Sequence, residues 1–283
     1  MTGYFSRWCV GLLVMSLAPF SVLAGQDKSV NDSAVKVKWG YKGDIVPERW
    51  GKLTPAFALC ATGKMQSPID ITQKIQIVPH GLSWQYQSAP MIIMDNGDTP
   101  LNLDGHQMII NEGHGVQLNF KDSPPREMIT FLGNPYRLVE FHFHSPSENR
   151  WHGQSFPMEM HFVHQGKAGK VAVIGVFVKA GEANPAIQQI VENLPKVEGR
   201  PFTIKGKRIN PADLMPHGKA YYHFKGSLTT PPCSEGLQWV VMADAITASP
   251  AQIALLRKAM GGDNARAVQP LNHRQISFSA EEN

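Results

Sequence analysis

The 283-residue sequence contains 27 Lys and Arg against 23 Asp and Glu, a formal net charge of +4, and 42% of its residues are hydrophobic. That length and that hydrophobic share suffice for one domain with a sizeable core. The charge imbalance is small and no long block of like charges occurs, so nucleic acid is not expected as a partner.

The first 24 residues have the features of a secretory signal peptide. Arg7 precedes an apolar run, WCVGLLVMSLAPF, and small residues then offer a cleavage site with Val22 and Ala24 at the key positions. The run is interrupted by serine and proline and is short for a bilayer span, so a retained anchor is the weaker alternative. Cleavage leaves residues 25–283 as one domain of a periplasmic protein, with no stable membrane anchor expected.

Two cysteines remain once Cys9 leaves with the signal peptide. Cys60 and Cys233 form an even pair in an exported chain, which predicts one disulfide. Two buried free thiols are the alternative.

Short strand-like runs recur along the chain and are separated by Gly, Pro and Asn. They are rich in β-branched and aromatic residues and cover 91–95, 107–111, 115–120, 136–144, 158–164, 171–178 and 237–244. Helices are few: Ser249 and Pro250 begin one over 251–260, and Asn184 and Pro185 begin another. We therefore expect a mainly β, single-domain fold around a large, twisted, mostly antiparallel sheet with short peripheral helices.

Histidines alternate with phenylalanines in the stretch VEFHFHSPSEN at 139–149. On a strand, Glu140, His142 and His144 share one face, while Phe141 and Phe143 face the core. The two imidazoles are then about 7 Å apart at Cα, a span that one metal ion can close. Alone, this pattern also fits ordinary core or surface histidines.

A second segment, MEMHFVH at 158–164, supplies a third histidine. Glu159, His161 and Val163 share one face of it, and a hairpin returning beside the first strand could bring His161 opposite the histidine pair. Three neutral imidazoles with a fourth position for water are the ligand set of catalytic zinc. His164 faces the other way and is predicted to be structural.

The sequence resembles an α-class carbonic anhydrase of the exported bacterial kind. The matching segments run from residue 39 to residue 276: WGY, QSPIDI, NEGH, EFHFHSPSEN, MEMHFVH, GSLTTPPCSEG and QPLNHRQI. The resemblance implies reversible hydration of carbon dioxide to bicarbonate and a proton, by attack of zinc-bound hydroxide. It also implies Zn²⁺ as cofactor, held by His142, His144 and His161.

The resemblance assigns roles to further residues. Thr229 would accept the hydrogen of the hydroxide and donate its own to Glu148, which as a carboxylate can only accept. Thr230 would contact bicarbonate and inhibitors, and sulfonamides and anions are the expected inhibitor classes. The apolar wall for carbon dioxide would comprise Val163, Val173, Leu228 and Trp239, although core packing explains these residues equally well.

Acceptors behind the ligands fix the tautomer of each imidazole. Glu159 would serve His161, and the backbone carbonyl of Asn264 the second histidine. Glu140 is a departure, because the family usually has glutamine behind the first ligand. A carboxylate there raises ligand basicity and predicts tighter zinc retention than glutamine.

The proton released in each turnover needs an exit. NEGH nominates His114 as the shuttle, because histidine titrates near neutrality. Tyr41, Glu112 and Gln117 match the polar residues that would order cavity water. Asn149 is a second departure, where animal members of the family carry histidine.

Other classes of function are disfavoured. A binding module that has lost its metal would lack ligands that are all present here, and a zinc store would carry a His-rich flank. A metalloprotease would carry His-Glu-x-x-His. The sequence is compatible with a homodimer, and weak esterase activity could accompany the hydratase.

Overall fold

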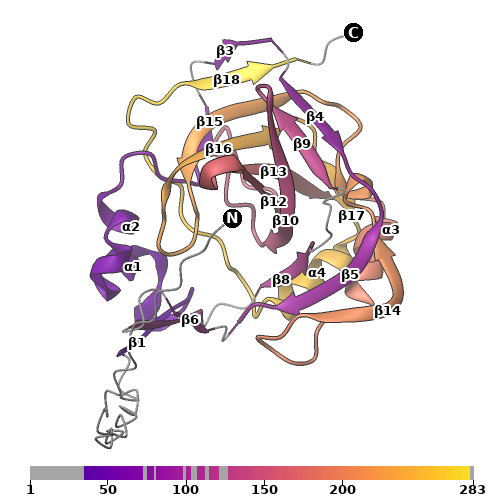
Figure 1. Ribbon diagram of the computed structural model, residues 1–283, viewed down its shortest axis with the longest axis horizontal. Helices are drawn as coiled ribbons and strands as arrows, with labels where there is room; N and C mark the ends of the chain where they lie inside the picture. The colour runs from indigo at the N-terminus through magenta and orange to yellow at the C-terminus, as the bar shows by residue number, and fades with distance from the viewer. Residues whose placement is uncertain are drawn as a thin grey trace, which may run out of the picture. The chain divides into compact units, whose positions relative to one another are not determined.

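The computed structural model describes residues 35–72, 75–79, 81–97, 100–102, 107–111, 115–120 and 127–280 (Figure 1). Two residues predicted for the proton path, Glu112 and His114, lie outside the described residues, as does the predicted signal peptide. Residues 34–283 form one compact unit. Among the helices of the described part, none has the length and hydropathy needed to cross a bilayer.

A 13-stranded sheet is the framework of this unit, which confirms the predicted mainly β fold. Its strands follow one path, with three strands beside it. The path comprises β14 (Phe202–Ile209), β5 (Ala89–Asp95), β8 (Val116–Asn119), β10 (Asn134–His144), β12 (Met158–Gly166), β13 (Val171–Ala180), β16 (Glu235–Met242), β15 (Tyr221–Ser227), β18 (Ile276–Ser279) and β3 (Ile75–Ile77). Beside it lie β17 (Ile246–Ala248) on β13, and β9 (Met128–Phe131) on β10 with β4 (Leu82–Gln85) on β9.

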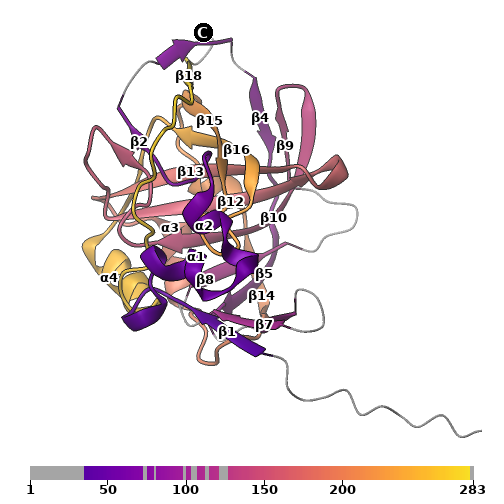
Figure 2. The ribbon, with the colours of Figure 1, turned by 90° about the vertical axis from the view of Figure 1, so that its left-hand side faces the viewer.

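Most neighbours in the large sheet are antiparallel, but the sheet is mixed. The pairs β13·β16, β13·β17 and β18·β3 are parallel. The hairpin predicted from the two histidine segments is present: β10 and β12 pair antiparallel and lie side by side in Figure 2.

Smaller elements surround this sheet. One further sheet has the strand order β1 (Val35–Trp39), β7 (Gln107–Asn111), β6 (Pro100–Asn102). Another pairs β11 (Arg150–Trp151) with β2 (Asp70–Ile71). The α-helices are α1 (Trp50–Leu53), α2 (Leu59–Thr62), α3 (Pro185–Val191) and α4 (Pro250–Ala259). The 3-10 turns are η1 (Gly43–Ile45), η2 (Pro47–Arg49), η3 (Pro55–Phe57), η4 (Lys167–Gly169) and η5 (Pro211–Leu214). Helix α4 has the N-cap Ser249 that the sequence indicated, and Gln252 completes a capping box with it.

The alternation along β10 separates the core from the candidate site. Phe141 and Phe143 are at most 1% exposed and join Phe162 of β12 in the largest hydrophobic cluster. Because neighbouring side chains on a strand point to opposite faces, this packing directs His142 and His144 away from that cluster. Burial of the phenylalanines therefore fixes which face carries the imidazoles.

His164 lies on the core face of β12, as predicted, and is fully buried. Its Nε2 is 2.7 Å from the hydroxyl oxygen of Tyr86, whose ring stacks on the imidazole. Burial lowers the pKa of His164 to about 3, because a charged imidazole would lose its hydration there. The neutral ring of His164 is part of the hydrophobic core and does not join His142, His144 and His161.

His164 makes the folded state sensitive to acid. The unfolded chain binds a proton at this residue below about pH 6.5 and the folded chain does not until about pH 3, so stability is lost as pH falls between these values. Between pH 7.5 and pH 4.5 the free energy of unfolding of the wild type should fall. For His164→Gln the fall should be smaller by about 2–3 kcal/mol, because this contribution is missing. Urea unfolding at both pH values measures this, and an identical pH dependence of the two proteins would contradict it.

Candidate metal centre

Three histidines from two neighbouring strands meet on one face of the sheet. His142 pairs directly with His161 across β10 and β12, and His144 lies two residues further along β10. The ring centroids are 5.0 Å apart for His142–His144, 5.4 Å for His142–His161 and 4.5 Å for His144–His161. One nitrogen from each ring lies within 4.8 Å of the others, a spacing at which the three could hold one ion.

The opposite nitrogen of each imidazole faces an acceptor. His142 Nδ1 lies 2.8 Å from Glu140 Oε2, and His144 Nδ1 donates to the carbonyl of Asn264 at 2.9 Å. His161 Nε2 lies 3.2 Å from Glu159 Oε1, within ion-pair distance. These acceptors direct the remaining nitrogens, Nε2 of His142 and His144 and Nδ1 of His161, toward one another.

The donor set fits zinc. Nε2 of His144 is buried without a hydrogen-bond partner, a state that costs free energy unless a ligand binds it. Burial and repulsion between the imidazoles lower the pKa of His144 and His161 well below the usual value, so both are neutral and able to ligate at pH 7. Burial works to lower the pKa of His142, but the carboxylates of Glu140, Glu148 and Glu159 together outweigh it, Glu140 most of all, and the net shift is upward.

Glu159 is oriented by a residue to which sequence reasoning gave no role. Asn149 is fully buried, and both its backbone N–H and its side-chain amide donate to the Glu159 carboxylate, at 2.8 and 2.7 Å. Burial raises the pKa of Glu159, and these bonds oppose the rise. The departure at Asn149 therefore lies in direct contact with the acceptor of His161.

Glu148 and Thr229 lie beside the cluster. Glu148 is 1% exposed, and its Oε2 is 3.5 Å from His144 Nε2 and 3.8 Å from His161 Nδ1. Burial raises the pKa of Glu148 to about 8, against hydrogen bonds from the Arg266 amide and the Thr229 hydroxyl. A cation held by the histidines would favour the ionised carboxylate.

The histidines lie in a cavity of about 370 Å³. Its lining also includes the predicted residues Tyr41, Gln117, Glu140, Val163, Val173, Leu228, Thr229, Thr230, Trp239 and Asn264. Glu148 and Glu159 lie behind the ligands instead. Trp239 donates its indole N–H to the Ser227 carbonyl at 2.9 Å, so its apolar ring is left for the wall. Asn96, which the sequence did not single out, also lines the cavity and donates to Gln117 at 3.2 Å.

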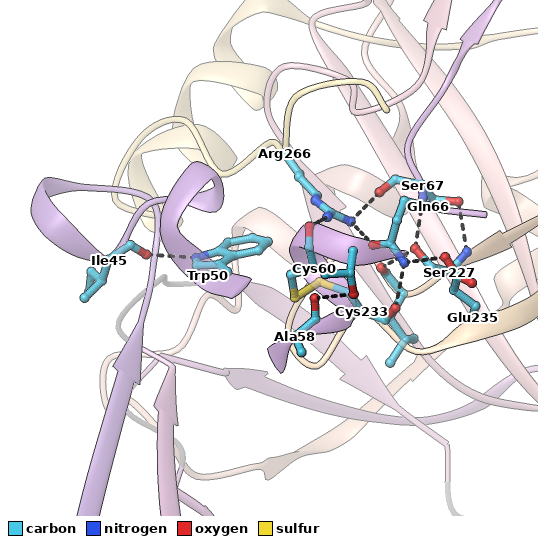
Figure 3. The surroundings of a disulfide bond; sticks show 12 residues. Ile45, Trp50, Ala58, Cys60, Gln66, Ser67, Ser227, Cys233, Glu235 and Arg266 are labelled. Carbon is cyan, nitrogen blue, oxygen red and sulfur yellow. Dashed lines mark hydrogen bonds between the residues drawn. A yellow bond between two sulfur atoms is a disulfide. The ribbon is translucent and has the colours of Figure 1, made fainter. Parts of the chain in front are cut away.

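Cys60 and Cys233 form the predicted disulfide, with Cα atoms 5.1 Å apart (Figure 3). Cys233 lies in the loop between β15 and β16 that carries Thr229. The loop is closed by Cys233 N–H donating to Thr230 O at 2.9 Å and Leu228 N–H donating to Ser234 O at 3.0 Å. The bond thus fastens this loop to helix α2.

Glu140 provides a test of how the chain holds metal. We expect Glu140→Gln to weaken zinc binding about tenfold, because a neutral amide accepts the His142 proton less strongly than a carboxylate does. The zinc dissociation constant, from competition with a chelator at fixed pH, measures this. Glu182→Gln, at an exposed position, is the control. Equal constants for the two variants would contradict the role of Glu140.

Comparison with known proteins shows the family of the chain. Residues 46–280 match the family model described as eukaryotic-type carbonic anhydrase. A carbonic anhydrase of Nostoc sp. is 39% identical over 266 residues, covering 93% of this chain and 95% of that protein. A hyperthermostable carbonic anhydrase from a hydrothermal vent chimney is 40% identical in structure comparison, with a TM-score of 0.76 over 85% of this chain and 99% of the other.

A further solved structure carries an inhibitor. The α-carbonic anhydrase of Thermovibrio ammonificans, in complex with sulfanilamide, is 37% identical with a TM-score of 0.75 and covers 84% of this chain and 98% of the other. Relatives and solved structures match over almost their whole length. The chain therefore belongs to the α-class, or eukaryotic-type, family of carbonic anhydrases.

Proposed function

We propose that this chain hydrates carbon dioxide reversibly to bicarbonate and a proton at a zinc centre held by His142, His144 and His161. The observation that carries the proposal is the convergence of one nitrogen from each of three histidines in a cavity, with no fourth Cys, His, Asp or Glu in that group among the described residues. A zinc ion there would lower the pKa of water to about 7, a value taken from carbonic anhydrases in general, and so supply hydroxide.

Thr229 and Glu148 orient the nucleophile in this proposal. The ionised Glu148 can only accept, so the Thr229 hydroxyl donates to it and leaves its own lone pairs as acceptors. Thr229 would then be the acceptor for the hydrogen of a hydroxide held at the metal, and so would orient that nucleophile. Thr230, next in the loop, contacts the bicarbonate product.

The cavity wall beside the histidines receives the substrate. Val163, Val173, Leu228 and Trp239 present apolar surface, which suits an apolar molecule because no polar group must be left unpaired. The wall and the three histidines line the same cavity, so a substrate held there would lie beside the candidate metal position.

We propose that His114 carries the proton outward, with Tyr41, Glu112 and Gln117 ordering water on the way. His114→Ala should lower turnover, and added imidazole buffer should restore it, because a small base can replace the missing ring. Stopped-flow hydration with and without imidazole measures this, and unchanged turnover without rescue would reject the role.

We propose that residues 1–24 direct export to the periplasm and are removed there. A mature protein whose intact mass retains them would overturn this. The cavity is also proposed to take sulfonamides and small anions, which the sulfanilamide complex of the Thermovibrio ammonificans protein supports. A thermal shift with sulfanilamide, absent after zinc removal, is the expected result.

The decisive experiment measures zinc content by mass spectrometry and carbon dioxide hydration by stopped flow on one sample. We expect one zinc per chain and hydration that is lost on chelation and regained with zinc. A protein that ignores zinc, or that takes it up without hydration, would leave a binding or storage role instead.

A further inference from the structure

Arg266 is a buried cation close to the candidate site. The residue is 3% exposed, and a buried guanidinium is costly unless its N–H groups are satisfied. Nη1 donates to Gln66 Oε1 at 2.9 Å and to Ser67 O at 2.8 Å, and Nη2 donates to Cys60 O at 2.9 Å (Figure 3). The guanidinium therefore joins the backbone at residue 266 to residues 60–67.

The backbone of the same residue contacts the carboxylate proposed to orient the nucleophile. Arg266 N–H donates to Glu148 Oε1 at 2.8 Å, and both residues are buried. This bond joins positions 118 residues apart, so its geometry depends on where the backbone at 266 is held. The three side-chain bonds of Arg266 hold it directly. Bonds from Asn264 to Ser145 and Phe143 hold the chain two residues earlier.

Gln66 connects this arrangement to the loop that carries Thr229. Its Nε2 donates to the carbonyl of Cys233 at 3.0 Å and to Glu235 Oε1 at 2.9 Å, while its Oε1 accepts from Arg266 (Figure 3). One amide side chain thus contacts both the residue that holds Glu148 and the loop of Thr229. The two partners of the proposed hydrogen bond are positioned against a common segment, residues 60–67.

We propose that Arg266 is a positioning residue, whose buried side chain sets the backbone amide that orients Glu148 toward Thr229. This inference rests on the proposed role of Glu148. Arg266 touches neither substrate nor ligand nitrogens. Its effect passes through one hydrogen bond, which distinguishes it from a residue that merely stabilises the fold.

Arg266→Lys tests this, because an ammonium cannot reproduce the planar fork that binds three acceptors in two directions. We expect kcat/KM for hydration to fall about tenfold, as small misplacements of catalytic groups do, with zinc content unchanged. The backbone amide proton of residue 266 should shift upfield in NMR spectra, because its bond to Glu148 weakens.

Arg274→Lys is the matched control. Arg274 also donates to backbone carbonyls, including Gln66 O at 2.7 Å and Lys225 O at 2.9 Å, and no described bond joins it to Glu148. We expect it to lower the melting temperature, to lower kcat/KM less than Arg266→Lys does, and to leave the residue 266 amide unchanged. If Arg266→Lys does not fold, Gln66→Leu removes one acceptor of the guanidinium and should give a smaller loss in the same direction.

A double-mutant cycle separates positioning from a general structural effect. Arg266→Lys should lower kcat/KM in the wild-type background and have no further effect in Glu148→Ala. Effects that multiply, or an equal loss in Arg274→Lys, would overturn the inference. If Glu148→Ala itself leaves kcat/KM unchanged, the proposed function of Glu148 fails instead, and an unmoved amide resonance in Arg266→Lys would refute the structural coupling separately.

Discussion

Replacing Cys60 and Cys233 together by alanine is expected to lower the melting temperature by roughly 10–20 °C. The disulfide closes a loop with a sequence separation of 173. The chain-entropy model gives such a closure roughly 5 kcal/mol, and a domain of this size shifts by about 2–4 °C per kcal/mol. Calorimetry on the purified, oxidised protein measures the shift.

The same variant should lose hydration activity at temperatures where it remains folded. Cys233 lies in the loop that carries Thr229, and its carbonyl accepts a hydrogen bond from Gln66. Removal of the disulfide should therefore loosen both this loop and the hydrogen bond from Gln66. Reduction of the wild type should reproduce the change, whereas the double variant should not respond to reductant. A fully active variant that melts at the wild-type temperature would show that the bond supports neither the fold nor the loop.

His144→Ala is expected to have the largest effect on metal binding. Structural zinc sites with four protein ligands bind zinc with apparent free energies of about 10–16 kcal/mol. An equal share for one ligand corresponds to a loss of zinc affinity of about 10²–10³-fold when that ligand is removed. Hydration should fall in parallel at limiting zinc and recover in part when zinc is in excess. Metal competition and stopped-flow assays on the same preparation measure both.

His164→Gln is the matched control for this substitution. It also removes a buried histidine, three positions from His161 on the same strand, but from the core face. The control should keep wild-type zinc affinity. Stoichiometric, tightly held zinc in His144→Ala would exclude His144 as a ligand.

Local sequence patterns were sufficient for the strands that carry the site. Along β10, phenylalanine and histidine alternate, and burial of Phe141 and Phe143 leaves one way for His142 and His144 to face. The capping residues of α4 likewise act over three positions. Such features were predictable because they depend on the period of one strand or on one helix end.

Other strands lacked a sufficient local signal. Strand β14 is mostly exposed and carries several charges, so it has no hydrophobic alternation to identify it. The parallel pairing of β13 with β16 joins segments far apart in the chain. The residues of one strand do not determine whether its neighbour runs parallel or antiparallel to it. Packing of the whole sheet decides both.

The sequence by itself determined which residue types could hold a metal, on which strands they lie and which face of each strand they occupy. The faces follow from the two-residue period of the backbone. Only the tertiary structure decided that Asn149 orients Glu159 and that Arg266 and Gln66 hold the surroundings of Glu148. The Arg266–Gln66 bond spans 200 residues, and a contact of that separation leaves no periodic trace in the chain. Buried polar groups are hydrogen-bonded in folded proteins, and the fold determines which segment lies close enough to supply the partner.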